Sequence, residues 1–259
     1  NFMCGIVGYI SSLPNDCLIN KLSSARDLMA HRGPDGSGIW FSDDRKVGLA
    51  HRRLSIIDLS EKASQPLFTS DGTVGIVFNG EIYNHREIRA ELEQKNIYTW
   101  QTDHSDTEVI LNSYLEWGIE CIHKLRGMFA FSLFDTINNC MFVVRDRMGV
   151  KPLYYFANEK EFIFASEIKP IMSLVGKGVL NYDAVVGYLM QRSSISPHTL
   201  VQNVIRLDAG SYLKITSDAG VIKVTENKYY DVWNFQNMNL ESVYQEKVVE
   251  NRIHELLVN

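Results

Sequence analysis

The sequence has few cysteines, no long apolar run and no excess of positive charge. Its 259 residues include four cysteines without CxxC spacing, which excludes a disulfide-stapled secreted scaffold and predicts reduced thiols. The longest nearly uninterrupted apolar stretches, 127–134 and 140–144, are less than half of the roughly 20 residues that a membrane-spanning helix needs. With 26 Lys and Arg against 31 Asp and Glu, the formal net charge of −5 lacks the basic excess of a nucleic-acid binder. We therefore expect neither nucleic acid nor membrane as a partner.

Leader and metal-ligand patterns are also missing. The apolar run 4–10 has no basic segment before it and is interrupted by Ser11, Ser12 and Pro14, so we expect no secretory signal and a cytoplasmic location. The seven histidines show neither an HExxH pattern nor an i, i+4 pair, which predicts no catalytic metal and no cofactor in this chain.

Short apolar segments dominate the pattern that is present. With 45% hydrophobic and 22% charged residues, the chain can bury a sizeable core. Segments rich in β-branched and aromatic residues predict strands at 5–10, 38–41, 73–78, 128–134 and 141–144. Because the strands outnumber the helices and short turns often join them, we expect an α+β fold with mostly antiparallel sheets covered by helices.

Two of the predicted helices have start signals. Asn84 with Glu87 and Ser105 with Glu108 match capping boxes, in which the side chains at both ends bond to each other's backbone. Their apolar positions predict burial of Ile88, Leu92, Ile110, Tyr114 and Trp117. A third helix is expected over 182–191 and a fourth from about Ser242.

The division into domains follows from one change in composition. Residues 4–231 contain no linker-like stretch and predict a single domain. Because 232–239 is polar and rich in Asn, we expect 232–259 to be a connector and the first helix of a further domain. The chain is then expected to be a piece of a longer protein.

Cys4 is the first residue with chemical potential. Taken alone, a cysteine at the head of an apolar strand predicts a small buried hydrophobe. A cysteine that directly follows an initiator Met, however, becomes the first residue once that Met is removed, and its α-amine (pKa roughly 8) can then accept the thiol proton (pKa roughly 8.5). We expect residues 1–3 to be a tag remnant followed by the initiator Met. The unprocessed chain is expected to be nearly inactive, because an amide nitrogen is no base.

Seven motifs follow one another along the chain. They are 3–8 (MCGIVG), 31–36 (HRGPDG), 50–58 (AHRRLSIID), 79–85 (NGEIYNH), 104–110 (HSDTEVI), 145–155 (RDRMGVKPLYY) and 165–169 (ASEIK). In this order they resemble the glutamine amidotransferase domain of class II amidotransferases, which are N-terminal nucleophile (Ntn) hydrolases, and most of all the asparagine synthetase type. The resemblance implies a four-layer αββα sandwich of two mostly antiparallel sheets.

The site residues follow from this resemblance and from the chemistry of glutamine. A free amino acid needs a fixed cation for its carboxylate and a fixed anion for its ammonium. Without context, Asn79-Gly80 would predict a hairpin turn, but the next residues lead into a helix, which leaves two donors free to stabilise an oxyanion. By resemblance the residues are Cys4 as nucleophile, Asn79 and Gly80 as the oxyanion hole, Arg53 for the α-carboxylate, Asp106 and Glu81 for the α-ammonium, and Leu54, Ile56 and Ile57 as the wall of the pocket.

The resemblance also implies partners outside this chain. Glutamine is hydrolysed to glutamate and ammonia, and the ammonia passes to a C-terminal synthetase domain that uses ATP and Mg²⁺; the acceptor is aspartate or, in relatives, the carboxylate of a cell-surface sugar. The segment 182–207 resembles a stretch that faces this domain, and a homodimer is a further expectation. Two other functions stay open, namely hydrolysis of a different amide and a non-enzymatic docking module. Intact Arg53 and Asp106 argue against the first, and intact Cys4, Asn79 and Asp106 against the second.

Overall fold

Two antiparallel sheets of six strands each form the centre of the fold. The computed structural model describes residues 3–54, 64–192, 196–232, 250, 251 and 254. The first sheet has the order β10 (Ile205–Arg206), β8 (Tyr154–Ala157), β9 (Glu161–Ala165), β1 (Gly5–Ser11), β3 (Val47–Arg53), β2 (Gly36–Phe41). The second has the order β12 (Val221–Lys228), β11 (Ser211–Asp218), β7 (Cys140–Arg145), β6 (Gly127–Asp135), β5 (Val74–Ile82), β4 (Leu67–Phe68).

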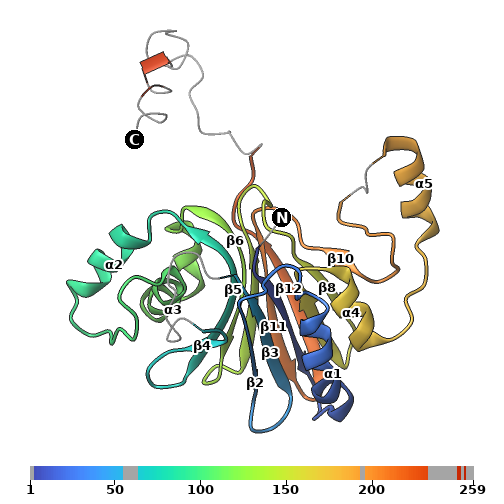
Figure 1. Cartoon of the computed structure of the whole chain (residues 1–259), viewed down its shortest axis with the longest axis horizontal. Coiled ribbons are helices and arrows are strands. Elements are labelled where there is room, and N and C mark those ends of the chain that lie inside the picture. The colour runs from blue at the N-terminus through green and yellow to red at the C-terminus, as the bar shows by residue number, and fades with distance from the viewer. Residues whose placement is uncertain (1–2, 55–63, 193–195, 233–249, 252–253, 255–259) are drawn as a thin grey trace.

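Helices cover the outer face of each sheet. Helices α1 (Asp16–Asp27) and α4 (Ile168–Val175) pack on the first sheet, while α2 (His85–Glu93), α3 (Asp106–Trp117) and the 3-10 helix η2 (Gly118–His123) pack on the second. Helix α5 (Tyr182–Gln191) extends away from both sheets (Figure 1). The arrangement confirms the predicted α+β class and the four-layer αββα sandwich.

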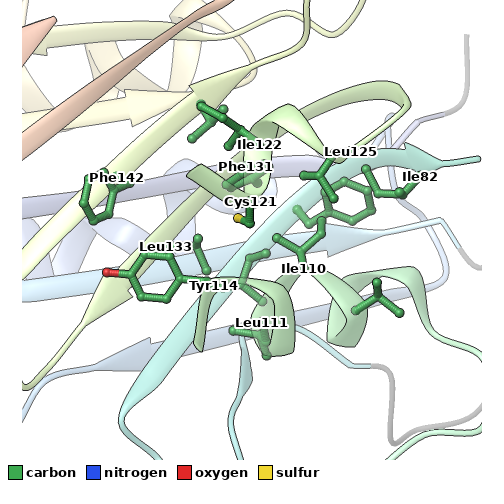
Figure 2. Packing of buried hydrophobic residues seen from close by; sticks show 14 of the residues in the cluster. Ile82, Ile110, Leu111, Tyr114, Cys121, Ile122, Leu125, Phe131, Leu133 and Phe142 are labelled. Carbon is green, nitrogen blue, oxygen red and sulfur yellow. The ribbon is translucent and has the colours of Figure 1, made fainter. Parts of the chain in front are cut away.

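Three apolar clusters hold the four layers together. One lies between α1, α4 and the first sheet, one between the two sheets, and one between the second sheet and α2, α3 and η2. Figure 2 shows the last of these, where Ile110 and Tyr114 of α3 lie against Phe131 and Leu133 of the second sheet. Burying an aliphatic or aromatic side chain of this size stabilises the folded state by about 1.5–3 kcal/mol. The three clusters therefore supply most of the stabilisation of the fold.

The three predicted helices that lie within the described residues form, but the two capping boxes are wrong. Helix α3 starts after Ser105, whose side chain makes no cap bond, because Glu108 instead accepts the N–H groups of Gln101 and Thr102. Helix α2 starts after Asn84, which bonds outside the helix to the backbone of Lys124 and Arg126. The third helix lies over 182–191 as predicted.

Burial follows the prediction closely at the predicted apolar positions. Ile88, Leu92, Ile110 and Tyr114 are buried and Trp117 is partly buried. The predicted fourth helix, from about Ser242, lies largely outside the described residues. Among the described helices, none is long and apolar enough to cross a lipid bilayer.

Strands β3, β11 and β12 and helix α1 were not predicted, and a further difference concerns the strand that carries Asn79. Its pattern predicts a strand that ends at Phe78, whereas β5 continues to Ile82. The continuation pairs with β6, placing Asn79 opposite Ala130 and Gly80 opposite Phe129. Cross-strand pairing thus extends a strand beyond the point where the local Asn-Gly signal would end it.

Candidate active site

The predicted site residues lie at one end of the space between the two sheets. Side chains alternate along a strand, so residues two apart share a face. Ile6 of β1, Leu49 of β3 and Val77 of β5 all belong to the apolar cluster between the sheets. Polar residues continue these strand faces at two-residue intervals. They are Cys4 before Ile6, His51 and Arg53 after Leu49, and Asn79 and Glu81 after Val77. The strands therefore direct these polar side chains to the same end of the inter-sheet space.

The Cys4 thiol is held by the backbone of Leu54. The Leu54 N–H donates to Sγ at 3.4 Å, and the thiol donates to the Leu54 carbonyl oxygen at 3.6 Å. Burial raises the pKa of the thiol above its ordinary value, while the Leu54 N–H and the charge of Arg53 act in the opposite direction and Asp106 adds to the rise. The thiol therefore needs a base beside it to become a nucleophile.

Asn79 presents an unused hydrogen-bond donor. Its side chain is 1% exposed, and its Nδ2 group has no partner among the described residues. A buried donor without an acceptor costs about 1–3 kcal/mol, so native structures rarely keep one without a use. An oxyanion that forms only during a reaction is such a use.

Gly80 directs its backbone N–H to the side of β5 that faces away from β6. N–H groups two residues apart on a strand point the same way. On one side of Gly80, the Phe78 N–H donates to Gln65 Oε1 at 2.6 Å, and on the other the Ile82 N–H donates to Asp106 Oδ2 at 3.1 Å. The Gly80 N–H therefore faces this side too, and the two-residue strand β4 does not reach it.

Asp106 is a buried carboxylate at the start of α3. It is 6% exposed, and burial raises its pKa to about 6, although the Ile82 N–H and the nearby His85 act to lower it. The charge of Glu81 raises it further. An anion held in a buried place at this cost fits a site that binds a cation.

The structure brings most of the predicted residues together. Electrostatic interactions link the Cys4 thiol to Arg53 and Asp106, and Asp106 to Glu81. Leu54 contacts the thiol directly. Ile56 and Ile57 lie outside the described residues, so their place in the pocket wall stays a prediction.

Sequence reasoning missed His51, which joins the two sheets beside the site. It is 1% exposed, and its Nε2 lies 3.1 Å from the carbonyl oxygen of Phe78, the residue before Asn79. Burial lowers its pKa to about 3, so the imidazole is neutral at physiological pH and donates this bond. Its position two residues before Arg53 on the same strand face was the available signal.

Two buried cations near the thiol were missed as well. Lys151 lies with its ammonium at the residue before Cys4, and Arg32 donates from Nε to the carbonyl oxygen of Cys4 at 3.0 Å. Arg145 and Asp146, which belong to the same motif as Lys151, bond to backbone groups of the loop that carries it. The motif containing Lys151 was the signal for it.

The site thus contains a thiol influenced by one cation and one anion, together with a buried side-chain amide donor that has no partner among the described residues. The comparisons with known proteins agree with this. A model of the glutamine amidotransferase domain matches residues 3–230. The chain therefore belongs to the glutamine amidotransferase domain family, and it is a class II enzyme with the Ntn hydrolase fold.

The chain is similar to two longer proteins that are named asparagine synthetases. Glutamine-hydrolyzing asparagine synthetase 1 of Bacillus subtilis is 38% identical over 259 residues, and the match covers 98% of this chain and 39% of that protein. Asparagine synthetase 2 of the same organism is 36% identical over 255 residues, covering 95% and 32%. The chain thus spans less than half the length of these relatives.

A solved structure shares the fold at low sequence identity. The glutamine phosphoribosylpyrophosphate amidotransferase from B. subtilis superimposes with a TM-score of 0.62 at 19% identity, covering 86% of this chain and 49% of that one. A likeness at this identity concerns the fold alone.

Proposed function

We propose that this domain hydrolyses glutamine to glutamate and ammonia, with Cys4 as an N-terminal nucleophile. The observation that carries the proposal is that the charges of Arg53 and Asp106 both act on the Cys4 thiol, with opposite signs. Arg53 binds the α-carboxylate of glutamine, and Asp106 with Glu81 binds the α-ammonium. This pairing supports free glutamine over an amide within a longer chain, which has neither charge at its Cα.

The base is the α-amine of Cys4, so the residues before it must be removed. Among the described residues, the thiol's hydrogen-bond partner is the Leu54 backbone, which cannot take its proton. We therefore propose that 1–3 are absent from the active enzyme. An α-amine and a thiol have similar pKa values, so the proton moves between them at little cost.

The reaction then proceeds in two halves. The amine takes the thiol proton, and the thiolate attacks the side-chain carbonyl carbon of glutamine. The Asn79 amide and the Gly80 N–H bind the tetrahedral oxyanion. The C–N bond of the glutamine side chain then breaks as the protonated α-amine of Cys4 gives its proton to the leaving nitrogen, which departs as ammonia. Water, deprotonated by the same amine, then hydrolyses the glutamyl thioester and releases glutamate with the thiol restored.

Trapping the thioester tests this function. We would mix the chain starting at Cys4 with glutamine, quench in acid and measure the intact mass. A glutamyl adduct on Cys4 and equal yields of glutamate and ammonia are expected, and the Cys4→Ala variant should show neither. Release of glutamate without any adduct, or with the adduct on another residue, would contradict the mechanism.

The acceptor of the ammonia belongs to another part of the protein. The two relatives are named asparagine synthetases and are longer than this chain, which supports a C-terminal synthetase domain with ATP and Mg²⁺ and favours aspartate over a sugar carboxylate as acceptor. Measuring asparagine formation from aspartate, ATP and glutamine by the full-length protein would decide this. Formation of an amidated sugar instead would overturn it.

Helix α5 offers a surface for that domain. Its side chains are largely exposed, among them Val186, Leu189 and Met190, the last being 80% exposed. An apolar helix face of this kind supports contact with another protein surface. In the full-length protein, Leu189→Asp is expected to release glutamate without matching amounts of aminated product; unchanged coupling would contradict this contact.

Two expectations stay predictions. A homodimer is measured by sedimentation equilibrium of the full-length protein, where a monomer at all concentrations would exclude it. A cytoplasmic location is measured by cell fractionation, and recovery in a membrane or secreted fraction would exclude it.

A further inference from the structure

Lys151 is a buried lysine whose ammonium lies at the N-terminal side of the nucleophile. Its side chain is 6% exposed, although lysine is almost never fully buried unless it is paired. Its Nζ donates to Met3 Sδ at 3.2 Å, and Met3 directly precedes Cys4. Within the described part of the chain, Lys151 makes no ion pair. A thioether is a weak acceptor, so this contact alone does not explain why an ammonium is buried here.

The loop between β7 and β8 fixes this lysine in place. Asp146 accepts the backbone N–H of Lys151 at 3.0 Å, together with those of Met148 and Val150. On the other side, Arg145 Nε donates to the Lys151 carbonyl oxygen at 2.8 Å. Both backbone groups of Lys151 are thus bound, so its side chain starts from a defined point toward Cys4.

Charged neighbours of both signs surround Lys151, but no carboxylate of the described residues forms an ion pair with it. Arg32 is a cationic neighbour of Lys151, but Arg32 forms an ion pair with Glu167 at 3.2 Å. The anionic neighbours are Asp146, which is committed to backbone N–H groups, and Glu81 from β5.

From the side of the thiol, the facing charges are Arg53, Asp106 and Lys151. Arg53 and Asp106 have opposite signs, so their effects on the thiol partly cancel. Burial lowers the pKa of Lys151, and the positive charge of Arg32 adds to this, whereas Asp146 and the Cys4 thiolate act to raise it.

We propose that Lys151 is a positioning residue for the nucleophile, acting through its charge on the α-amine and the thiol of Cys4. Once Met3 is removed, the ammonium loses its contact with the Met3 sulfur and is left close to the new N-terminus. A cation there disfavours protonation of the amine, which keeps it available as a base at neutral pH, and it stabilises the thiolate that results. The inference rests on the proposed N-terminal nucleophile.

The test titrates Cys4 with iodoacetamide, which needs no glutamine hydrolysis. We would follow the alkylation rate against pH for the chain starting at Cys4, comparing wild type with Lys151→Met, Lys151→Arg and the control Lys21→Met, since Lys21 is an exposed residue of α1. Loss of a nearby charge should raise the apparent thiol pKa by about one unit in Lys151→Met. Lys151→Arg should stay close to wild type, because the charge is kept.

Activity gives the second measurement. At saturating glutamine, kcat of Lys151→Met at pH 7 should fall about tenfold and recover toward alkaline pH, with Lys151→Gln as a replacement if the methionine variant does not fold. An unchanged alkylation profile in a folded, charge-free variant would overturn the proposal. A shifted alkylation profile in a chain that does not hydrolyse glutamine would support the role of Lys151 and contradict the proposed function.

Discussion

Asp106 Oδ2 accepts the backbone N–H of Ile82 at 3.1 Å. This bond ties the first residue of α3 to the strand that carries Asn79 and Gly80. The proposed ammonium-binding carboxylate is therefore tied directly to the strand of the proposed oxyanion donors. A helix and a sheet strand hold side chains more firmly than loops would.

The buried charge of Asp106 should lower the free energy of unfolding of the protein when no glutamine is bound. Between the ordinary pKa near 3.9 and the value of about 6 in the fold, the folded protein binds the proton more tightly than the unfolded chain. The stabilisation by protonation is therefore complete below pH 4 and lost as the pH rises past 6.

Asp106→Asn should thus raise the free energy of unfolding at pH 7.5 by up to about 3 kcal/mol. Urea denaturation of both proteins measures this, and the difference should vanish near pH 4. A variant that is less stable than wild type at pH 7.5 would show that burying the charged carboxylate does not destabilise the fold.

The same group predicts how glutamine binding depends on pH. The charges at the Cα of glutamine do not change between pH 5 and 7, whereas Asp106 takes up a proton near 6. KM for glutamine should rise about tenfold per pH unit below 6. In Asp106→Asn, KM should be high and independent of pH over this range; a KM that still varies as in wild type would assign the effect to another group.

Asn79→Ala tests the oxyanion hole. Because the donor is needed only in the transition state, kcat should fall about a hundredfold or more while KM changes little. Asn112→Ala is a matched control, since Asn112 of α3 is also buried and its Nδ2 also lacks a partner among the described residues. Equal losses of kcat in both variants would indicate damage to the fold instead of a lost donor.

Gly80→Ala should be damaging for a steric reason. A Cβ on Gly80 would lie 2.3 Å from the carbonyl oxygen of Met128 and 2.7 Å from the Cα of Phe129, both in the backbone of β6. The strands must separate, so the free energy of unfolding should fall by about 2 kcal/mol and glutamine hydrolysis should be lost. Gly36→Ala, whose Cβ would meet only Arg53 Cβ and Cδ at 3.6 and 3.9 Å, should unfold like wild type; equal destabilisation of both would reject the steric account.

The sequence predicted the fold class well because strand periodicity and turn residues are local signals. It proposed the polar positions of the site through motifs, and strand alternation explains why Cys4, Arg53 and Asn79 share the strand faces of Ile6, Leu49 and Val77. The extension of β5 to Ile82 was missed because pairing with β6 is a long-range effect that overrides the local Asn-Gly signal.

Other features depended on competition between partners. Glu108 could cap α3 by its position in the sequence, but the folded chain offers it two backbone donors at Gln101 and Thr102. The burial of Lys151 depends on the loop that Asp146 and Arg145 organise, and nothing in the spacing of charges indicates it. The tertiary structure determines which of several possible hydrogen-bond partners a side chain takes.

The central claim is that Cys4 acts with its own α-amine as the base. The most direct measurement is glutamate release from glutamine by two versions of this chain, one starting at Cys4 and one with Asn1-Phe2-Met3 in front of it. The account predicts hydrolysis by the first version alone, and its loss in Cys4→Ala. Hydrolysis at a comparable rate by the version that keeps Asn1-Phe2-Met3 attached, without cleavage detected by mass, would contradict it.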